Sequence, residues 1–279
     1  MVRSQVVFSN YPYHKMSLRY TLDSLKRLGA EKIEFVACEP HFYVDDVASN
    51  EAFVLKDMLR ERDLEIVCLT APCNEYPINL ASSNPITRKR SVDYIVKHIQ
   101  YANHFEAPAV QFVAGEATLR EERDEAMKRA VESLAYLADI AAGYGVKLLN
   151  SYADSKLISV FSSAEEVQKA HESIGGNAFA GMTDTVFLSR CGESVKDVME
   201  TFGRELYLVE FADCKRGSGM HLALTEGDLD IDGIFADFDA AGYKGYYSLN
   251  MRGSREPYLY EEEPERCMRT AAEYLFGKL

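Results

Sequence analysis

The feature that most constrains this chain is a regular alternation between short apolar segments and longer segments with helical periodicity. Near its start, Ser17 can cap a helix whose face carries Leu18, Leu22 and Leu25, and the apolar segment Lys32–Val36 follows. Strands that alternate with helices are typical of parallel sheets, because the connection between two parallel strands must run back along the sheet and is usually an α-helix. The alternation predicts eight strands: Gln5–Phe8, Lys32–Val36, Glu65–Leu69, Ala109–Val113, Val146–Leu149, Ala178–Thr183, Leu206–Phe211 and Tyr246–Leu249.

The segments between these strands carry the helices. Eight strand–helix units with no linker between them favour a single α/β domain over residues 1–279, folded as a (β/α)8 TIM barrel. A doubly wound open sheet is the alternative, but no Gly-x-Gly-x-x-Gly motif follows the first strand. After the helix capped by Ser17, the expected helices are Glu51–Arg62, Thr87–Phe105, Glu121–Ala142, Ser163–Ile174, Glu193–Thr201, Ile231–Ala241 and Glu261–Phe276.

Charge and the distribution of apolar residues disfavour several classes of function. The formal net charge of −13 argues against nucleic acid as a partner, because neutralising phosphates needs an excess of Lys and Arg. No apolar run reaches the roughly 18 residues of a membrane span, and the first apolar run is too short for a signal peptide. We therefore expect a cytoplasmic protein with no membrane partner. Its six cysteines include no CxxC pair and are expected to be free thiols.

In a TIM barrel, the side chains that follow the strands converge on one mouth. Here they form a polar, hydrogen-bonding set that suits a polyhydroxylated ligand better than a lipid. Taken singly, each is better explained as a solvated loop residue or a helix cap, but the last four strands all end in Asn, Asp or Glu. The set is His14, Glu39, Thr70, Glu116, Asn150, Asp184, Glu210 and Asn250, with Arg216 and Arg252 just beyond the last two strands.

Three stretches of the chain resemble a known family of barrels. They are LDSLKRLGAEKIEFV, which contains Glu34, then NLAS at residues 79–82, and HLALTEGDLD at 221–230, which is followed by AGYKGY. All three are similar to the xylose-isomerase-like superfamily, which includes sugar isomerases, 3-epimerases of the tagatose and psicose type, inosose dehydratases and endonuclease IV. The resemblance covers nearly the whole chain and implies a TIM barrel with a small-carbohydrate ligand.

The resemblance also implies a metal site, and here the chain departs from the family pattern. Family enzymes hold one divalent metal with Glu, Asp, His and Glu at the ends of the fifth to eighth strands, and the matching residues are Asn150, Asp184, Glu210 and Asn250. Because an amide does not titrate, the family's proton shuttle between two glutamates cannot run unchanged. The four residues carry two negative charges and no imidazole, which suits Mn²⁺ or Mg²⁺ better than zinc and leaves metal binding open.

The resemblance assigns roles to individual residues. Glu210 and Asp184 are the expected catalytic carboxylates. Arg216 falls where epimerases place a substrate-binding arginine, whereas Phe187 replaces a family histidine and His221 is expected at the rim or in a structural role. The expected substrate-binding residues are Asn150, Asn250, Arg216, Glu116, His14 and Arg252.

Three functions stay open at this point: a sugar or sugar-phosphate isomerase or epimerase, with dehydration as a variant; a catalytically silent sugar-binding regulatory barrel; and a partner subunit of an active paralogue. A homo-oligomer is one option for the assembly. His98, His104 and His171 fall on predicted helices away from the strand ends and are expected at the surface.

Overall fold

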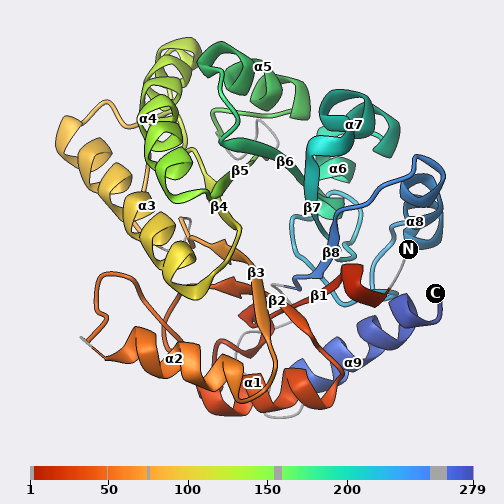
Figure 1. The fold of residues 1–279 in the computed structure, drawn as a ribbon. Coiled ribbons are helices and arrows are strands. Elements are labelled where there is room, and N and C mark those ends of the chain that lie inside the picture. The colour runs from red at the N-terminus through yellow and green to blue at the C-terminus, as the bar shows by residue number, and fades with distance from the viewer. Residues whose placement is uncertain (1–2, 49, 74–75, 154–158, 252–262, 279) are drawn as a thin grey trace.

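Eight parallel strands close into a barrel, and helices surround it (Figure 1). The computed structural model describes residues 3–48, 50–73, 76–153, 159–251 and 263–278. Neighbours in sequence are neighbours in the barrel, and β1 pairs with β8 to complete it. The expected (β/α)8 barrel is therefore confirmed. The strands are β1 (Val6–Ser9), β2 (Lys32–Val36), β3 (Glu65–Thr70), β4 (Ala109–Val113), β5 (Lys147–Ser151), β6 (Phe179–Asp184), β7 (Leu206–Glu210) and β8 (Tyr246–Leu249).

The helices begin and end within a few residues of the expected positions. One short helix, α6, was not expected. It begins directly after β6, with Asp184 as its cap, so no loop residues separate the strand from the helix and indicate where the helix starts. The helices are α1 (Leu18–Arg27), α2 (Glu51–Arg60), α3 (Pro85–Phe105), α4 (Arg123–Tyr144), α5 (Ala164–Ile174), α6 (Thr185–Cys191), α7 (Val195–Phe202), α8 (Ile231–Ala240) and α9 (Glu263–Phe276).

Side chains alternate between the barrel interior and the layer under the helices, as they must along a strand. The larger buried set packs strands against helices and includes Leu148 and Val110. Above the apolar interior, toward the carboxyl ends of the strands, the inward positions become polar. The interior set is Cys68, Ala109, Leu149, Ala180, Met182 and Leu208.

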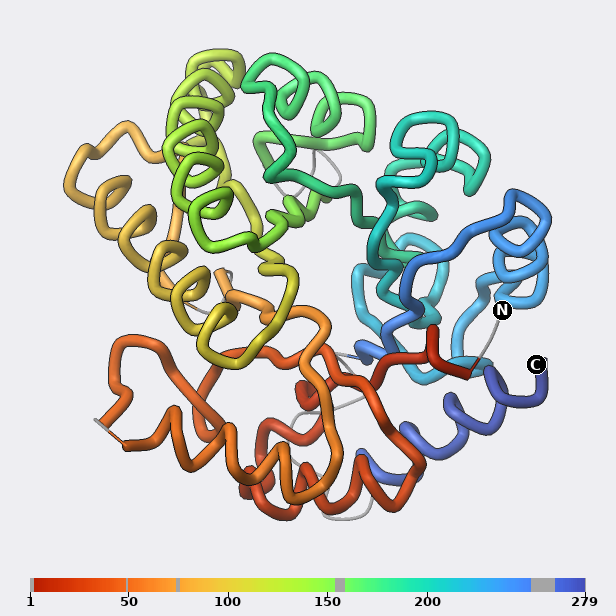
Figure 2. The backbone as a smooth tube through the Cα atoms, in the orientation of Figure 1, coloured from red at the N-terminus to blue at the C-terminus, as the bar shows by residue number. Residues whose placement is uncertain are grey.

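The two ends of the chain lie side by side (Figure 2). The guanidinium of Arg3 lies 4.4 Å from the ring centroid of Phe276 in α9, and Phe276 also contacts Phe8 of β1. These contacts hold the last helix against the first strand. Within the described residues the six cysteines form no disulfide.

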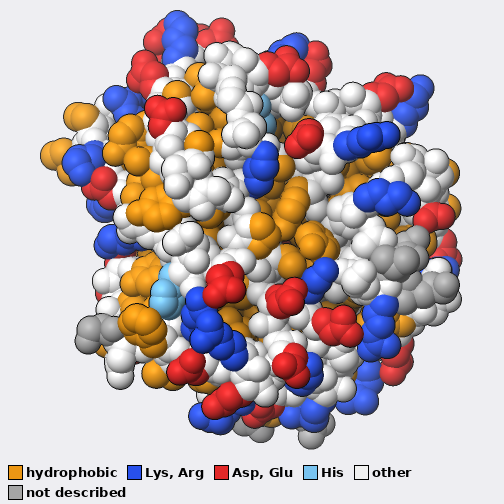
Figure 3. All heavy atoms as spheres, viewed as in Figure 1, with side chains coloured by type: hydrophobic (Ala, Val, Ile, Leu, Met, Phe, Trp, Pro, Cys, Tyr) orange, Lys and Arg blue, Asp and Glu red, His pale blue; other side chains and the backbone are white. Residues whose placement is uncertain are grey.

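On the surface, acidic and basic side chains alternate around the rim of the face in Figure 3, so this face offers no broad basic area. None of the helices described has the length and apolar character needed to cross a membrane. The expectation of surface histidines is wrong for His98 and His171, which are both buried. Each packs against an aromatic ring, Tyr94 and Phe179 respectively, under its helix.

Candidate functional site

Three buried side chains converge at the carboxyl ends of β6 and β7. Asp184 ends β6, Glu210 ends β7, and the two are direct partners in the parallel ladder. His221 comes from the loop after β7. One ligand atom from each of the three lies within 4.8 Å of the other two, and all three residues are buried. Two carboxylates and an imidazole at the mouth of a TIM barrel form a candidate catalytic or metal centre.

Asp213 folds the loop that delivers His221. Its backbone pairs with Leu222 in both directions, with N···O distances of 3.0 and 2.7 Å, so the chain doubles back beside β7. Its carboxylate accepts hydrogen bonds from the backbone N–H groups of Cys214, Gly227 and Leu229. A Cβ on Gly227 would lie 1.9 Å from Asp213 Oδ1, so only glycine fits this close approach. The Gly-Asp turn therefore places His221.

The ring of His221 is oriented by its two neighbours. Its Nδ1 lies 3.1 Å from the carbonyl oxygen of Gly219, and because a carbonyl only accepts, Nδ1 carries a hydrogen. Its Nε2 therefore faces Asp184 Oδ2, at 2.5 Å. With a hydrogen on Nδ1, Nε2 presents a lone pair to the carboxylate, so a proton or a cation must bridge those two atoms. The site thus contains an imidazole, which the four residues expected to bind the metal do not include.

Asp184 is held on both sides. Its Oδ1 accepts hydrogen bonds from the N–H groups of Val186 and Phe187, which begin α6, and its Oδ2 faces His221. Phe187 also packs edge-on against the His221 ring, at 5.5 Å between centroids. Phe187, which occupies the place of a family histidine, therefore packs against the imidazole of His221.

Glu210 belongs to a network that crosses the barrel. Its Oε1 accepts hydrogen bonds from Gln111 Nε2 at 2.8 Å and Asn250 Nδ2 at 2.9 Å. The same Nδ2 of Asn250 donates to Glu34 Oε1, also at 2.9 Å. Thr70 Oγ1 lies 2.7 Å from Glu34 Oε1 and 3.0 Å from Gln111 Oε1, and its single hydrogen is donated to one of these two acceptors at a time. Asn250 thus connects Glu34 and Glu210 directly.

Glu34 and Gln111 were missed as site residues by sequence reasoning. Glu34 is completely buried, and its second oxygen accepts a 2.5 Å hydrogen bond from Ser248. Burial is the main cause that raises the pKa of the Cys68 thiol in the layer below, and the negative charge of Glu34 raises it further. The available signal was a charged or amide residue in the middle of an apolar strand, KIEFV and AVQFV, which costs free energy unless it is hydrogen-bonded.

A pocket of about 510 Å³ opens beside this cluster at the mouth. Thr70 and Gln111 form part of its wall and also bond Glu34 and Glu210, so the pocket borders the carboxylates. Phe187, which contacts His221, lines it as well. The wall continues over the ends of β3, β4 and β5 to the start of α3.

The structure places Asn150 away from this cluster. Leu149 belongs to the interior set, so the alternation along β5 turns Asn150 to the other side, with Leu148, under the helices. Its two amide atoms are buried and lack a hydrogen-bond partner within the described part of the chain. The expected strand register was off by one residue, because the four residues Val146–Leu149, with one lysine and two adjacent leucines, show no clear alternation. Ser151 is the residue that lines the pocket.

The remaining expected residues are dispersed. Glu116 is exposed and lines the pocket, whereas His14 is half-buried and stacks on Tyr11, which lines it. The side chain of Arg216 is exposed, and its backbone N–H bonds Asp228. Arg252 lies outside the described residues.

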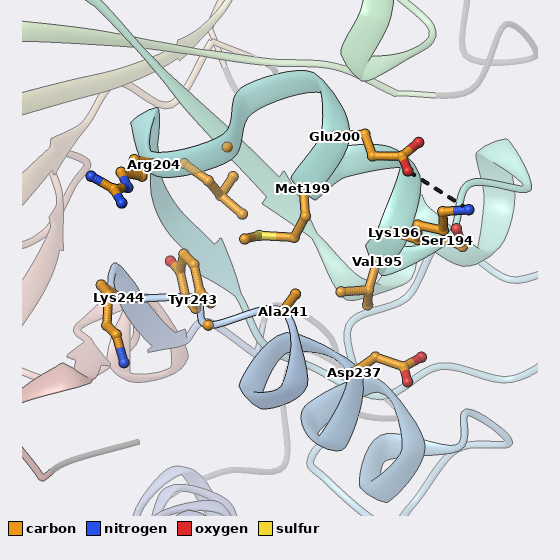
Figure 4. A pocket seen from close by; sticks show the side chains of 13 residues that line it. Ser194, Val195, Lys196, Met199, Glu200, Arg204, Asp237, Ala241, Tyr243 and Lys244 are labelled. Carbon is orange, nitrogen blue, oxygen red and sulfur yellow. Dashed lines mark ion pairs between the residues drawn. The ribbon is translucent and has the colours of Figure 1, made fainter.

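A larger groove, of about 950 Å³, lies outside the barrel between α7 and the end of α8 (Figure 4). Val195, Met199 and Ala241 give it an apolar floor, and the Lys196–Glu200 ion pair lies at one end. None of the buried polar residues described above lines this groove. Size alone therefore does not make it the candidate site.

The cluster fits a divalent cation. Asp184, Glu210 and His221 offer two carboxylate oxygens and one imidazole nitrogen in a buried setting, a mixed set that suits Mn²⁺, Co²⁺ or Zn²⁺. The carbonyl of Gly219 at Nδ1 leaves Nε2 as the coordinating atom, and such outer partners are typical of metal-binding histidines.

Known proteins resemble this chain over nearly its full length. A sequence profile of the family described as xylose isomerase-like TIM barrel matches residues 22–275. A fructoselysine 3-epimerase of Shigella flexneri is 22% identical over 261 residues, which cover 94% of this chain and 93% of that protein.

Solved structures agree on the fold. A D-tagatose 3-epimerase-like protein superposes with a TM-score of 0.82 at 18% identity, covering 98% of this chain and 96% of its own. The IOLI protein, crystallised with a bound zinc atom, superposes with a TM-score of 0.79 at 14% identity, covering 98% and 97%.

Proposed function

Because the chain belongs to the xylose isomerase-like TIM-barrel family, we propose that it is an isomerase or epimerase of a small polyhydroxylated carbohydrate. The observation that carries the proposal is the convergence of Asp184, Glu210 and His221 at the barrel mouth. The relatives described as 3-epimerases support it, since such a reaction removes a proton from a carbon beside a carbonyl and returns one.

We assign Asp184, Glu210 and His221 as the residues that hold a divalent cation. When bound there, the cation would polarise the substrate carbonyl and stabilise the negative charge that develops on its oxygen. Asp184 bonds α6 through one oxygen and His221 through the other, so it holds the site together and is not the group that exchanges a proton with the substrate. This revises its expected role as a base.

Glu210 is the base in this proposal. Gln111 and Asn250 both donate to its Oε1, which fixes the plane of the carboxylate. Glu210 takes the proton from the carbon beside the carbonyl, and the electron pair moves to the carbonyl oxygen. A proton delivered by solvent water to the opposite face of the same carbon, with Glu210 releasing its own proton to solvent, gives an epimer. Transfer of the proton from Glu210 to the former carbonyl carbon, with loss of the hydroxyl proton from the neighbouring carbon, gives an isomer.

Proton exchange with solvent tests this assignment. Fructose, psicose and tagatose are incubated with the Mn²⁺-loaded protein in D₂O, and deuterium next to the carbonyl is followed by NMR. We expect incorporation with the wild type and a loss of roughly 100-fold or more in Glu210→Gln. Glu122→Gln, which alters an exposed acid outside the pocket, is the control. Ketose binding with no exchange would favour the catalytically silent sugar-binding barrel instead.

A cytoplasmic location and a single domain over residues 1–279 remain predictions from the sequence, and a homo-oligomer remains an option. They rest on composition and on the repeat pattern.

A further inference from the structure

The groove between α7 and the end of α8 is large enough to hold a ligand of its own. Its volume of about 950 Å³ lies within the range of pockets that bind small molecules. It shares no lining residue with the mouth pocket, and the proposed reaction does not use it. A ligand in this groove would therefore occupy a second site, apart from that of the substrate.

The packing of α7 on its other neighbours leaves the groove open. Phe202, in the last turn of α7, lies against Gly181 of β6, where a Cβ would come within 2.4 Å of the Phe202 ring. The glycine thus allows the end of α7 to approach β6 closely. α7 also packs more extensively on α5 than on α8. The side of α7 that faces α8 is left partly uncovered, and Met199 on that side is only half-buried.

The apolar floor of the groove is held in place by the turn before β8. Tyr243 is buried in the lining, and its hydroxyl lies 2.8 Å from the carbonyl oxygen of Tyr246 and 3.2 Å from that of Tyr207. A Cβ on Gly245 would lie 2.4 Å from both the Tyr207 carbonyl oxygen and the Tyr243 hydroxyl, so glycine is needed there. Leu206, buried at the start of β7, also lines the groove. The floor is therefore formed before any ligand binds.

The charged side chains around this floor are unevenly distributed (Figure 4). Arg204 and Lys244 lie at one end, and neither forms an ion pair with another residue in the described part of the chain. Glu200 and Asp237 lie toward the opposite end, where Glu200 pairs with Lys196 at 3.7 Å. The groove thus combines an apolar surface with positive charge at one end.

This combination selects among the classes of small molecule. An apolar group that covers the floor removes apolar surface from water, which is favourable, whereas a sugar or a nucleotide would place polar groups against it. An anionic group beside the two unpaired cations gains a further attraction that a neutral hydrocarbon lacks. The ligand that uses both features has an apolar body and a single anionic end.

We propose that this groove binds an amphiphilic carboxylate, with its aliphatic chain over Met199 and Tyr243 and its carboxylate beside Arg204 and Lys244. The site lies outside the barrel and does not depend on the proposed reaction. The eight residues of α7 span about 12 Å, which limits the length of chain that the groove can cover.

A series of carboxylates tests the proposal: hexanoate, octanoate, decanoate and dodecanoate, with octanol as the neutral comparison. Each is titrated into the wild type, and the NMR signal of the Met199 methyl group, identified by its loss in Met199→Leu, reports binding in the groove. Affinity should rise by up to about 4-fold for each added methylene group and stop rising once the extended chain is longer than the groove. Octanoate should bind more tightly than octanol.

Paired charge variants separate the two cations from the charge of the whole protein. The double variant Arg204→Gln/Lys244→Gln should bind octanoate more weakly, by up to about 5-fold for each cation removed, and should bind octanol as the wild type does. Lys15→Gln/Arg19→Gln removes the same charge from two exposed side chains outside the groove and should bind octanoate as the wild type does. Thermal melts show that each variant is folded.

Octanol binding as tightly as octanoate, an unchanged Met199 signal, or equal losses in the two double variants would overturn the proposal. Failure of all four carboxylates to bind would also overturn it, and would leave a segment of a partner protein as the occupant. Sedimentation of the wild type and the Arg204→Gln/Lys244→Gln variant covers the remaining case. A dimer that these substitutions dissociate would assign the groove to a second copy of the chain and contradict the proposal.

Discussion

His221 Nε2 and Asp184 Oδ2 lie 2.5 Å apart, although the two residues are 37 positions apart in the chain and lie on different elements. Since Nδ1 already carries a hydrogen for Gly219, Nε2 and Oδ2 are both acceptors, and in the metal-free protein only a proton can bridge them. A cation that binds both atoms must displace it.

Binding of Mn²⁺ to the metal-free protein should therefore release about one proton per ion near neutral pH. Calorimetric titrations in two buffers of different ionisation enthalpy measure the number released. The same heat in both buffers would mean that His221 and Asp184 are not the ligands.

Glu34 should matter through the groups it orients. Glu34→Ala removes one of the two acceptors of Asn250 and one of the two acceptors near Thr70, so Asn250 is held less firmly against Glu210 and Glu210 loses part of its fixed orientation. We expect the exchange rate or the Mn²⁺ affinity to fall by about 10- to 100-fold. Glu34→Gln keeps an acceptor oxygen for both donors and should recover most of the loss. Equal losses in the two variants would show that the charge of Glu34, not its geometry, is what the site uses.

Asn150 provides a test of the strand register. Its two buried amide atoms have no partner among the described residues, and it lies with Leu148 under the helices. Asn150→Leu should leave proton exchange unchanged and leave the free energy of unfolding unchanged or raise it by about 1 kcal/mol. Denaturant unfolding and the D₂O assay check both. Loss of exchange with intact folding would return Asn150 to the site.

Buried histidines should make the fold sensitive to acid. Burial lowers the pKa of His171 to about 4, below its ordinary value of 6.5. The unfolded chain binds the proton more tightly, so this contribution to stability is complete above pH 6.5 and is lost as the pH falls toward 4. By pH 4 the loss is on the order of 3 kcal/mol.

His171→Phe removes this titration and keeps a ring against Phe179. Its free energy of unfolding, from urea titrations, should fall less between pH 7 and pH 4.5 than that of the wild type. The pKa of His98 is also lowered to about 4, so the variant should retain part of the acid sensitivity. An identical pH dependence in the two proteins would contradict the assignment.

The sequence was sufficient for the architecture because each strand and helix is encoded locally. Lys32–Val36, Ala109–Val113 and Tyr246–Leu249 are strands with the bounds expected from apolar runs. The same runs say little about which side of the strand faces the interior. A short segment such as VKLL, which ends in two adjacent leucines, allows either register, and that is how Asn150 was misassigned.

The site was harder to predict than the barrel because it depends on contacts distant in sequence. His221 reaches Asp184 only because Asp213 turns the loop back, and no local pattern reports that path. Glu34 and Glu210 are linked through Asn250, which directly follows a third strand, β8. Asp184 and Glu210 were identified because they end strands, the one position that the fold itself directs to the mouth.

The most direct test of the central claim is equilibrium binding of Mn²⁺ to the metal-free protein, followed by electron paramagnetic resonance of the free ion. We predict about one tight site per chain in the wild type and at least 10-fold weaker binding in His221→Ala. His14→Ala, which changes a histidine outside the cluster, should bind as the wild type does. Thermal melts of the metal-free proteins would show that each variant is folded. Absence of a tight site in the wild type, or equal affinity in His221→Ala, would contradict a metal centre formed by Asp184, Glu210 and His221.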